Sequence, residues 1–202
     1  MTDILLTNDD GYKSAGLFPL LRELSKEFSV VAVAPSEEKS WISKAITAWR
    51  ELELKEVEVN SHKLFSLDGT PADCAQIGLY GVLDKKPKLV VSGINTGGNA
   101  GHGRILSSGT VGAAMEASID GIKSLASSLY LPPEIKNSTD FNDPENYKMF
   151  ENAAKITVKL VRIIIGKELW ENVDLISLNI PFTAEADAEF EVTKPFRAPY
   201  GK

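Results

Sequence analysis

The chain has 202 residues, of which 43% are hydrophobic and 25% charged, and its 28 acidic and 22 basic residues give a formal net charge of −6. This composition is typical of one globular domain, residues 1–202, because domains usually run to roughly 100–200 residues. The acidic charge disfavours binding to nucleic acid duplexes and to anionic membranes, and no apolar run approaches the ~20 residues that span a bilayer. A signal-peptide pattern is absent from the first residues, and the single cysteine, Cys74, suits a reducing compartment. We therefore expect a cytoplasmic protein.

The first elements form a β-α-β pattern. Residues 3–7 and 29–34 are short apolar runs rich in β-branched side chains, and between them leucines recur at helical spacing from Leu17 to Leu24. Continuous apolar strands separated by an amphipathic helix are typical of a parallel sheet that is covered on both faces.

The next segment has a different periodicity. Residues 47–67 alternate apolar and charged side chains, with interruptions near Lys55 and Asn60, which predicts an antiparallel β-ribbon inserted into the fold. Thr70, followed by a proline, then predicts the N-cap of a helix that continues to about Leu83. Residues 88–93 are expected to form another buried strand.

The second half returns to α/β alternation. A helix is predicted from Thr110, a strand over 124–131, a polar and proline-rich surface loop over 132–146, a long helix over 147–166 and a strand over 173–180. The whole pattern predicts an α/β fold with three αβα layers, a Rossmann-like, mostly parallel sheet and a β-ribbon insertion.

Two adjacent carboxylates, Asp9 and Asp10, follow the first predicted strand and precede Gly11. Ligands of doubly wound sheets bind beyond the carboxyl ends of the strands, and a glycine permits a turn that brings both side chains to one point. A divalent cation there would convert the repulsion between the carboxylates into attraction. An ordinary Asx-turn or helix cap explains the motif equally well when it is taken alone.

The other loops at the same edge of the sheet carry further oxygen ligands. Ser40 and Ser43 follow the second strand, and Asn95 and Asn99 follow the strand at 88–93. Carboxylate, hydroxyl and amide oxygens form a hard donor set that suits Mg²⁺ or Mn²⁺. Each of these residues alone is more often a turn residue than a ligand.

Glycines are concentrated between positions 93 and 112, which indicates close backbone approaches. The sequence SSGT, at 107–110, comes directly before a predicted helix, so its backbone N–H groups and hydroxyls could surround a phosphate. The alternative is that Ser108 or Thr110 only caps that helix.

Taken together, these segments resemble the SurE family of metal-dependent phosphatases that act on nucleoside monophosphates. The resemblance covers roughly the first 120 residues and rests on five motifs in order: NDDG at 8–11, APxxxxS at 34–40, DGTPADC at 68–74, SGIN at 92–95 with GxN at 97–99, and SGTV at 108–111.

The resemblance implies hydrolysis of nucleoside 5′-monophosphates, with 3′-monophosphates and other phosphomonoesters as further substrates, by a water bound to Mg²⁺ or Mn²⁺. The implied metal ligands are Asp9, Asp10, Ser40 and Asn95. The catalytic residues that we expect with it are Asp9, Asp10 and Asn99. The expected phosphate-binding residues are Asn8, Ser43, Asn95, Asn99, Ser108, Gly109 and Thr110.

The chain also departs from the family pattern. Trp41 stands where the family usually has a glycine, and Ser107 stands where an aromatic residue is common. His102 and Arg104, in the glycine-rich segment, are more typical of solvated side chains than of catalytic ones. Family members use their C-terminal part in dimer contacts, and the final FRAPYGK is expected to be an extended tail, so we expect a homodimer or higher homo-oligomer.

Two other functions would need different residues from this one. A covalent mechanism of the haloacid dehalogenase type needs two aspartates separated by one residue after the first strand, and here position 8 is Asn8, so that spacing fails. A non-catalytic module that binds a nucleotide or phosphate as a regulatory ligand remains the alternative, although it leaves the paired aspartates unexplained.

Overall fold

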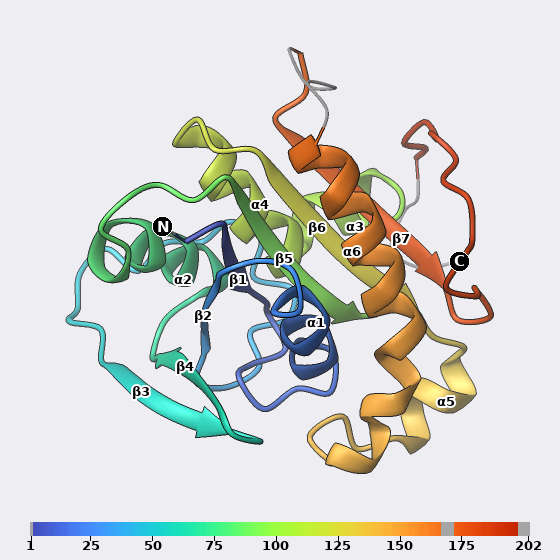
Figure 1. Cartoon of the computed structure of the whole chain (residues 1–202), viewed down its shortest axis with the longest axis horizontal. Coiled ribbons are helices and arrows are strands. Elements are labelled where there is room, and N and C mark those ends of the chain that lie inside the picture. Colours follow the sequence, from blue (N-terminus) through green and yellow to red (C-terminus); the bar gives the residue numbers. More distant parts are fainter. Residues whose placement is uncertain (1, 167–171, 198–202) are drawn as a thin grey trace.

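A computed structural model describes residues 2–166 and 172–197, and within them seven strands form one sheet in the order β3-β4-β2-β1-β5-β6-β7 (Figure 1). All neighbouring strands are parallel except β3 and β4. The predicted three-layer, mostly parallel fold is confirmed. Most of the predicted tail, residues 198–202, lies outside the described residues, as does Met1. The strands are β1 (Ile4–Thr7), β2 (Val30–Pro35), β3 (Leu54–Val59), β4 (His62–Leu67), β5 (Leu89–Thr96), β6 (Ser124–Tyr130) and β7 (Leu175–Pro181).

Helices cover both faces of the sheet, with α1 and α6 packed together on one side and α2 and α4 on the other (Figure 1). Strand β1 is apolar throughout because both of its faces are buried. Ile4 and Leu6 pack in the core beneath α1 and α6, whereas Leu5 packs with Cys74 in the core on the opposite face. In the described part of the chain, no helix is long and apolar enough to cross a membrane. The covering helices are α1 (Leu17–Leu24), α2 (Pro71–Ile77), α4 (Gly109–Ile119) and α6 (Glu151–Gly166).

The predicted β-ribbon is the hairpin β3–β4, which forms one edge of the sheet because β4 also pairs with β2. Asn60 and Ser61 make its turn with φ angles of 49° and 62°, as a tight two-residue hairpin turn requires. The expected interruption near Lys55 is wrong, since Lys55 pairs with Ser66 inside the ladder. Residues 47–53 precede the hairpin without strand structure.

Two predicted elements have different lengths in the structure. The helix from Thr70 begins with a capping box, in which Thr70 and Asp73 bond each other's backbone N–H groups, but α2 ends at Ile77 and a π-helical turn, η1 (Gly78–Val82), follows it. Strand β5 runs on past its predicted end to Thr96, because pairing with β6 resumes after an irregularity between Ser92 and Asn95. Asn95 is therefore a strand residue and does not lie in a loop.

Short helices occupy two segments that were expected to be loops. The glycine-rich segment contains α3 (His102–Ser107), and the proline-rich segment contains α5 (Pro133–Ser138) and the start of the 3₁₀ helix η2 (Pro144–Phe150). In α5, a proline at the first helical position offsets the breaking effect that proline has elsewhere. Residues of both α3 and α5 line the cavity described next.

Candidate active site

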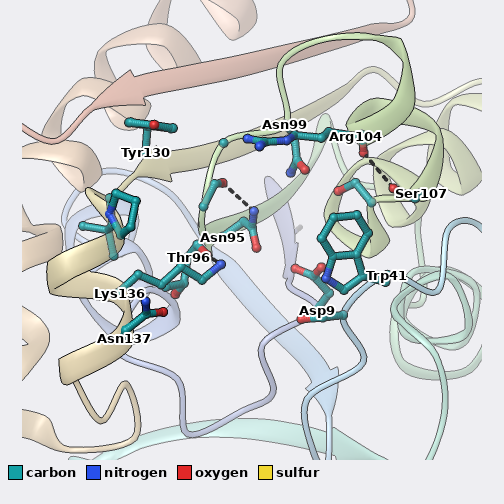
Figure 2. A pocket seen from close by; sticks show the side chains of 16 residues that line it. Asp9, Trp41, Asn95, Thr96, Asn99, Arg104, Ser107, Tyr130, Lys136 and Asn137 are labelled. Carbon is teal, nitrogen blue, oxygen red and sulfur yellow. Dashed lines mark hydrogen bonds between the residues drawn. The ribbon is translucent and has the colours of Figure 1, made fainter. Parts of the chain in front are cut away.

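A cavity of about 270 Å³ opens where β1, β2, β5 and β6 end (Figure 2). Helix α3 supplies one part of its wall and α5 another. The structure brings five of the predicted site residues to this cavity: Asp9, Ser40, Asn95, Asn99 and Ser108.

Asp9 is buried against the first turn of α4. The Thr110 hydroxyl donates a 2.7 Å hydrogen bond to its Oδ1, and a Cβ at Gly109 would lie only 2.8 Å from the Asp9 Cβ. Burial, followed by the negative charge of Asp10, raises the pKa of Asp9 to about 7, although the Thr110 bond opposes that rise. The helix N-terminus therefore packs directly on this carboxylate.

Asp10 is held on the other side of the turn by the backbone N–H of Thr96, which donates to its Oδ2 at 2.9 Å. Burial raises the pKa of Asp10 to about 6, the charge of Glu38 adds to the rise, and the charge of Lys136 opposes it. None of the ion pairs among the described residues includes Asp9 or Asp10. Two adjacent, largely desolvated carboxylates thus lack an ion-pair partner in the part of the chain that the structure describes.

The two asparagines have different hydrogen-bonding roles. Asn95 donates from Nδ2 to a backbone carbonyl two residues on, at 2.6 Å, so its Oδ1 is the atom left to face a ligand. Asn99 is buried and donates from Nδ2 to the hydroxyls of Ser128, at 2.9 Å, and Thr110, at 3.4 Å. Because Thr110 in turn donates to Asp9, Asn99 supports the carboxylate through a relay of hydrogen bonds.

The two serines after β2 are placed differently. Ser40 lines the cavity, and its hydroxyl donates to the Glu38 carboxylate at 2.6 Å, which leaves lone pairs on Oγ. Ser43 points away and bonds to α3: its hydroxyl donates to the Leu106 carbonyl at 2.6 Å and its N–H to the Ser107 carbonyl at 3.0 Å. The structure makes Ser43 an anchor of the loop, and its phosphate contact stays a prediction.

The remaining predicted residues lie in the turn after β1 and at the start of α4. Asn8 is fully buried and donates both amide hydrogens within the turn, to the Gly11 carbonyl at 2.9 Å and the Ser14 hydroxyl at 2.8 Å. Ser108 is the N-cap of α4, because its hydroxyl accepts from the Val111 N–H at 3.1 Å, and it also lines the cavity. The phosphate contacts expected of Asn8, Gly109 and Thr110 stay predictions.

Comparison with known proteins identifies the family. The family model described as Survival protein SurE matches residues 4–202. The chain belongs to the SurE family. The 5′-nucleotidase SurE of Archaeoglobus fulgidus is 38% identical over 201 residues, which are 98% of this chain and 73% of the relative. The 5′-nucleotidase SurE of Methanocaldococcus jannaschii is 37% identical over 202 residues, which are 98% of this chain and 74% of that relative.

A solved structure supports the same assignment. The crystal structure of the SurE protein from Aquifex aeolicus superposes with a TM-score of 0.75 at 35% identity, over 91% of this chain and 67% of the other. The resemblance inferred from the five motifs is therefore confirmed, and this chain has the SurE fold.

The donor atoms at the cavity of this SurE chain fit a hard divalent cation. Among the described residues, no three histidine, cysteine, aspartate or glutamate side chains lie close enough together to hold a metal ion. The available donors are the carboxylate of Asp9, the neutral oxygens of Ser40 and Asn95, which line the cavity with it, and the carboxylate of the adjacent Asp10. Oxygen ligands of this kind suit Mg²⁺ or Mn²⁺, which usually bind one or two carboxylates and keep several waters. A cation would also supply the positive charge that the buried pair lacks.

Most of the cavity residues were not predicted as site residues, and four of these carry large or charged side chains that a ligand could contact. They are Trp41, Arg104, Tyr130 and Lys136 (Figure 2). Lys136 reaches from α5 and donates to the Thr96 carbonyl at 2.9 Å, and its segment has a composition that predicted only a loop. Arg104 was expected to be solvated; it is exposed and also lines the cavity. His102 is exposed and does not line the cavity, and its N–H donates to the Phe196 carbonyl.

Proposed function

We propose that this SurE chain hydrolyses nucleoside 5′-monophosphates to nucleoside and inorganic phosphate, with Mg²⁺ or Mn²⁺ held by Asp9, Asp10, Ser40 and Asn95. The observation that carries the proposal is the adjacent pair of buried Asp9 and half-buried Asp10, which lacks an ion-pair partner among the described residues. Asp9 lines the cavity, and Asp10 follows it in the chain. The printed names of the relatives, 5′-nucleotidase SurE, agree with this chemistry. We extend the proposal to 3′-monophosphates and other phosphomonoesters as secondary substrates.

When bound, the cation would neutralise charge on the phosphoryl oxygens and lower the pKa of a water molecule so that it becomes a nucleophile at neutral pH. The residues of the chain keep the two carboxylates in place for this task. Thr110 donates to Asp9, so rotation of the carboxylate would break this hydrogen bond, and Asn99 in turn donates to Thr110 and holds its hydroxyl. The Thr96 N–H holds Asp10 in the same way.

The cavity wall also offers cationic groups to an anionic substrate. Arg104 from α3 and Lys136 from α5 both line the cavity, and their charges oppose the overall acidic character of the chain. An arginine fork matches the geometry of phosphate oxygens, and a lysine acts as a point charge. We assign to these two residues attraction of the phosphate, with Asn99 and Ser108 as polar contacts beside it.

Release of inorganic phosphate from AMP tests the proposal. The protein is treated with EDTA, the chelator is removed, and release is measured before and after addition of Mn²⁺ or Mg²⁺, with 3′-AMP and p-nitrophenyl phosphate as parallel substrates. We expect release that depends on the added cation. Nucleotide binding without release under every condition would contradict the proposal and would favour the regulatory binding module.

We further propose that the chain forms a homodimer or higher homo-oligomer and acts in the cytoplasm. Residues 182–197 follow β7 without regular secondary structure and expose Val192 and Phe196, which are 99% and 59% accessible. Such side chains are candidates for contact with a second copy. A monomer mass by light scattering at micromolar concentration would contradict the oligomer.

The proposed cytoplasmic location agrees with Cys74, the single cysteine of the sequence, which is buried and free.

A further inference from the structure

Trp41 places a large aromatic ring at the wall of the cavity, directly after Ser40. The residue is 67% exposed, and Figure 2 shows its indole between Asp9 and Ser107 in that view. The proposed function uses Ser40 and Asp9 but gives Trp41 no part.

The loop that carries Trp41 is anchored on both sides. Before it, the N–H of Lys39 donates to the Asp9 carbonyl at 2.8 Å. After it, Ser43 makes its two hydrogen bonds to the C-terminal end of α3. Helix α4 also packs closely on the loop, because a Cβ at Gly112 would lie 2.3 Å from the Ser43 carbonyl oxygen. The backbone that carries the indole is therefore held in position before any ligand arrives.

The backbone of Trp41 is strained. Its φ angle is 61°, in the left-handed region that residues with a Cβ rarely adopt and that glycine adopts freely. Strained residues of this kind cluster at ligand sites, where the surrounding structure holds them. A glycine would adopt this backbone conformation without strain, so the tryptophan is kept here at a cost in backbone energy.

We propose that the indole of Trp41 is the surface on which the nucleobase of the substrate stacks, so that the site favours nucleotides over phosphate esters without an aromatic group. The inference rests on the proposed function and names the group that would recognise the part of the substrate remote from the phosphate. With the phosphate near Asp9, the nucleoside extends along the adjoining wall, which Trp41 forms. Stacking on an aromatic ring tolerates every base, since each base has a π-face, so the site would select for a base without selecting which one.

The test is the ratio of kcat/KM for AMP to kcat/KM for ribose 5-phosphate, which carries the same phosphate and sugar without the base. In Trp41→Gly this ratio should fall about tenfold, equivalent to about 1.4 kcal/mol, and Trp41→Phe should recover most of it. Trp49→Ala is the matched control, because Trp49 is 97% exposed and does not line the cavity, and its ratio should equal that of the parent. The melting temperature of Trp41→Gly should be no lower than that of the parent, since glycine relieves the strain.

An unchanged ratio in Trp41→Gly, or an equal fall in Trp49→Ala, would overturn the inference. If the parent releases phosphate from neither ester, the proposed function fails and the inference is tested by calorimetric binding of the same two ligands. A preference for AMP that disappears in Trp41→Gly would then support the stacking surface without catalysis. Equal binding of AMP by the parent and Trp41→Gly would overturn it.

Discussion

Replacing Asp10 by asparagine should stabilise the metal-free protein at neutral and alkaline pH. The substitution keeps the shape of the side chain and an oxygen that can accept from the Thr96 N–H, now 2.9 Å away, but it removes a half-buried negative charge. Burial raises the pKa of Asp10 from 3.8 to about 6, so the folded protein binds a proton more tightly than the unfolded chain does. Ionisation of Asp10 therefore costs stability, and this cost develops as pH rises from about 4 to about 6.

The size of the effect follows from the pKa. Each tenfold change in proton affinity corresponds to about 1.36 kcal/mol, so the rise to about 6 corresponds to at most ~3 kcal/mol near pH 8. Asp10 keeps some contact with solvent, and we therefore expect a gain of about 1–3 kcal/mol, or a melting temperature higher by roughly 2–12 °C for a chain of this length. The charge of Asp10 also contributes to the raised pKa of Asp9. Its removal should lower that pKa and so stabilise the folded protein further.

Urea unfolding in EDTA near pH 8 and near pH 4 measures this difference. The gain should be present at the higher pH and absent at the lower one, where the parent carboxyl is already protonated. Asp84→Asn, at an exposed site outside the cavity, is the control and should change stability by less than about 0.5 kcal/mol. Added Mn²⁺ should raise the melting temperature of the parent more than that of Asp10→Asn. A loss of stability that is the same at both pH values, together with an equal response to Mn²⁺, would refute the reasoning.

Two further substitutions test the support of Asp9. Gly109→Ala places a Cβ 2.8 Å from the Asp9 Cβ and 3.1 Å from the Lys39 carbonyl oxygen, so it should cost about 1–3 kcal/mol in urea unfolding and reduce phosphate release. The control Gly166→Ala, whose added Cβ meets nothing within 4 Å, should do neither, and equal behaviour of the two would count against the close contact. Thr110→Val deletes the 2.7 Å hydrogen bond to Asp9 and should lower the free energy of unfolding by about 1.5–3 kcal/mol at pH 8. Thr110→Ser keeps the hydroxyl and should keep most of the stability. Similar losses in both variants would show that the hydroxyl bond is not the cause.

The strands and the covering helices were predictable because their signals are local. The apolar runs at β1 and β2 are continuous since both faces are buried, and Leu5 packs opposite to Ile4 and Leu6. The N-cap Thr70 was also predictable, because its partner Asp73 lies three residues along the chain. The short helices α3 and α5 were missed, since their glycine- and proline-rich segments have weak helical signals and are placed by contacts with distant parts of the chain.

The sequence predicted which segments form the site, but it did not predict where every side chain in those segments points. Asp9 and Asn95 come to one cavity because the carboxyl ends of parallel strands meet at one edge. Ser43 lies in the expected loop, yet its hydroxyl bonds to Leu106, 63 positions away, and no local pattern encodes that partner. Lys136 is the clearest omission, because its position depends on how α5 packs over the end of β5.

Binding of Mn²⁺ to the metal-free protein, followed by the electron paramagnetic resonance signal of free Mn²⁺, tests most directly the claim that Asp9 and Asp10 form a metal site. The account predicts saturable binding to the parent that is lost when Asp9 and Asp10 are both replaced by asparagine, while circular dichroism shows that the double variant stays folded. Equal Mn²⁺ binding by the parent and the folded double variant would contradict the account, and the two aspartates would then be only part of a turn.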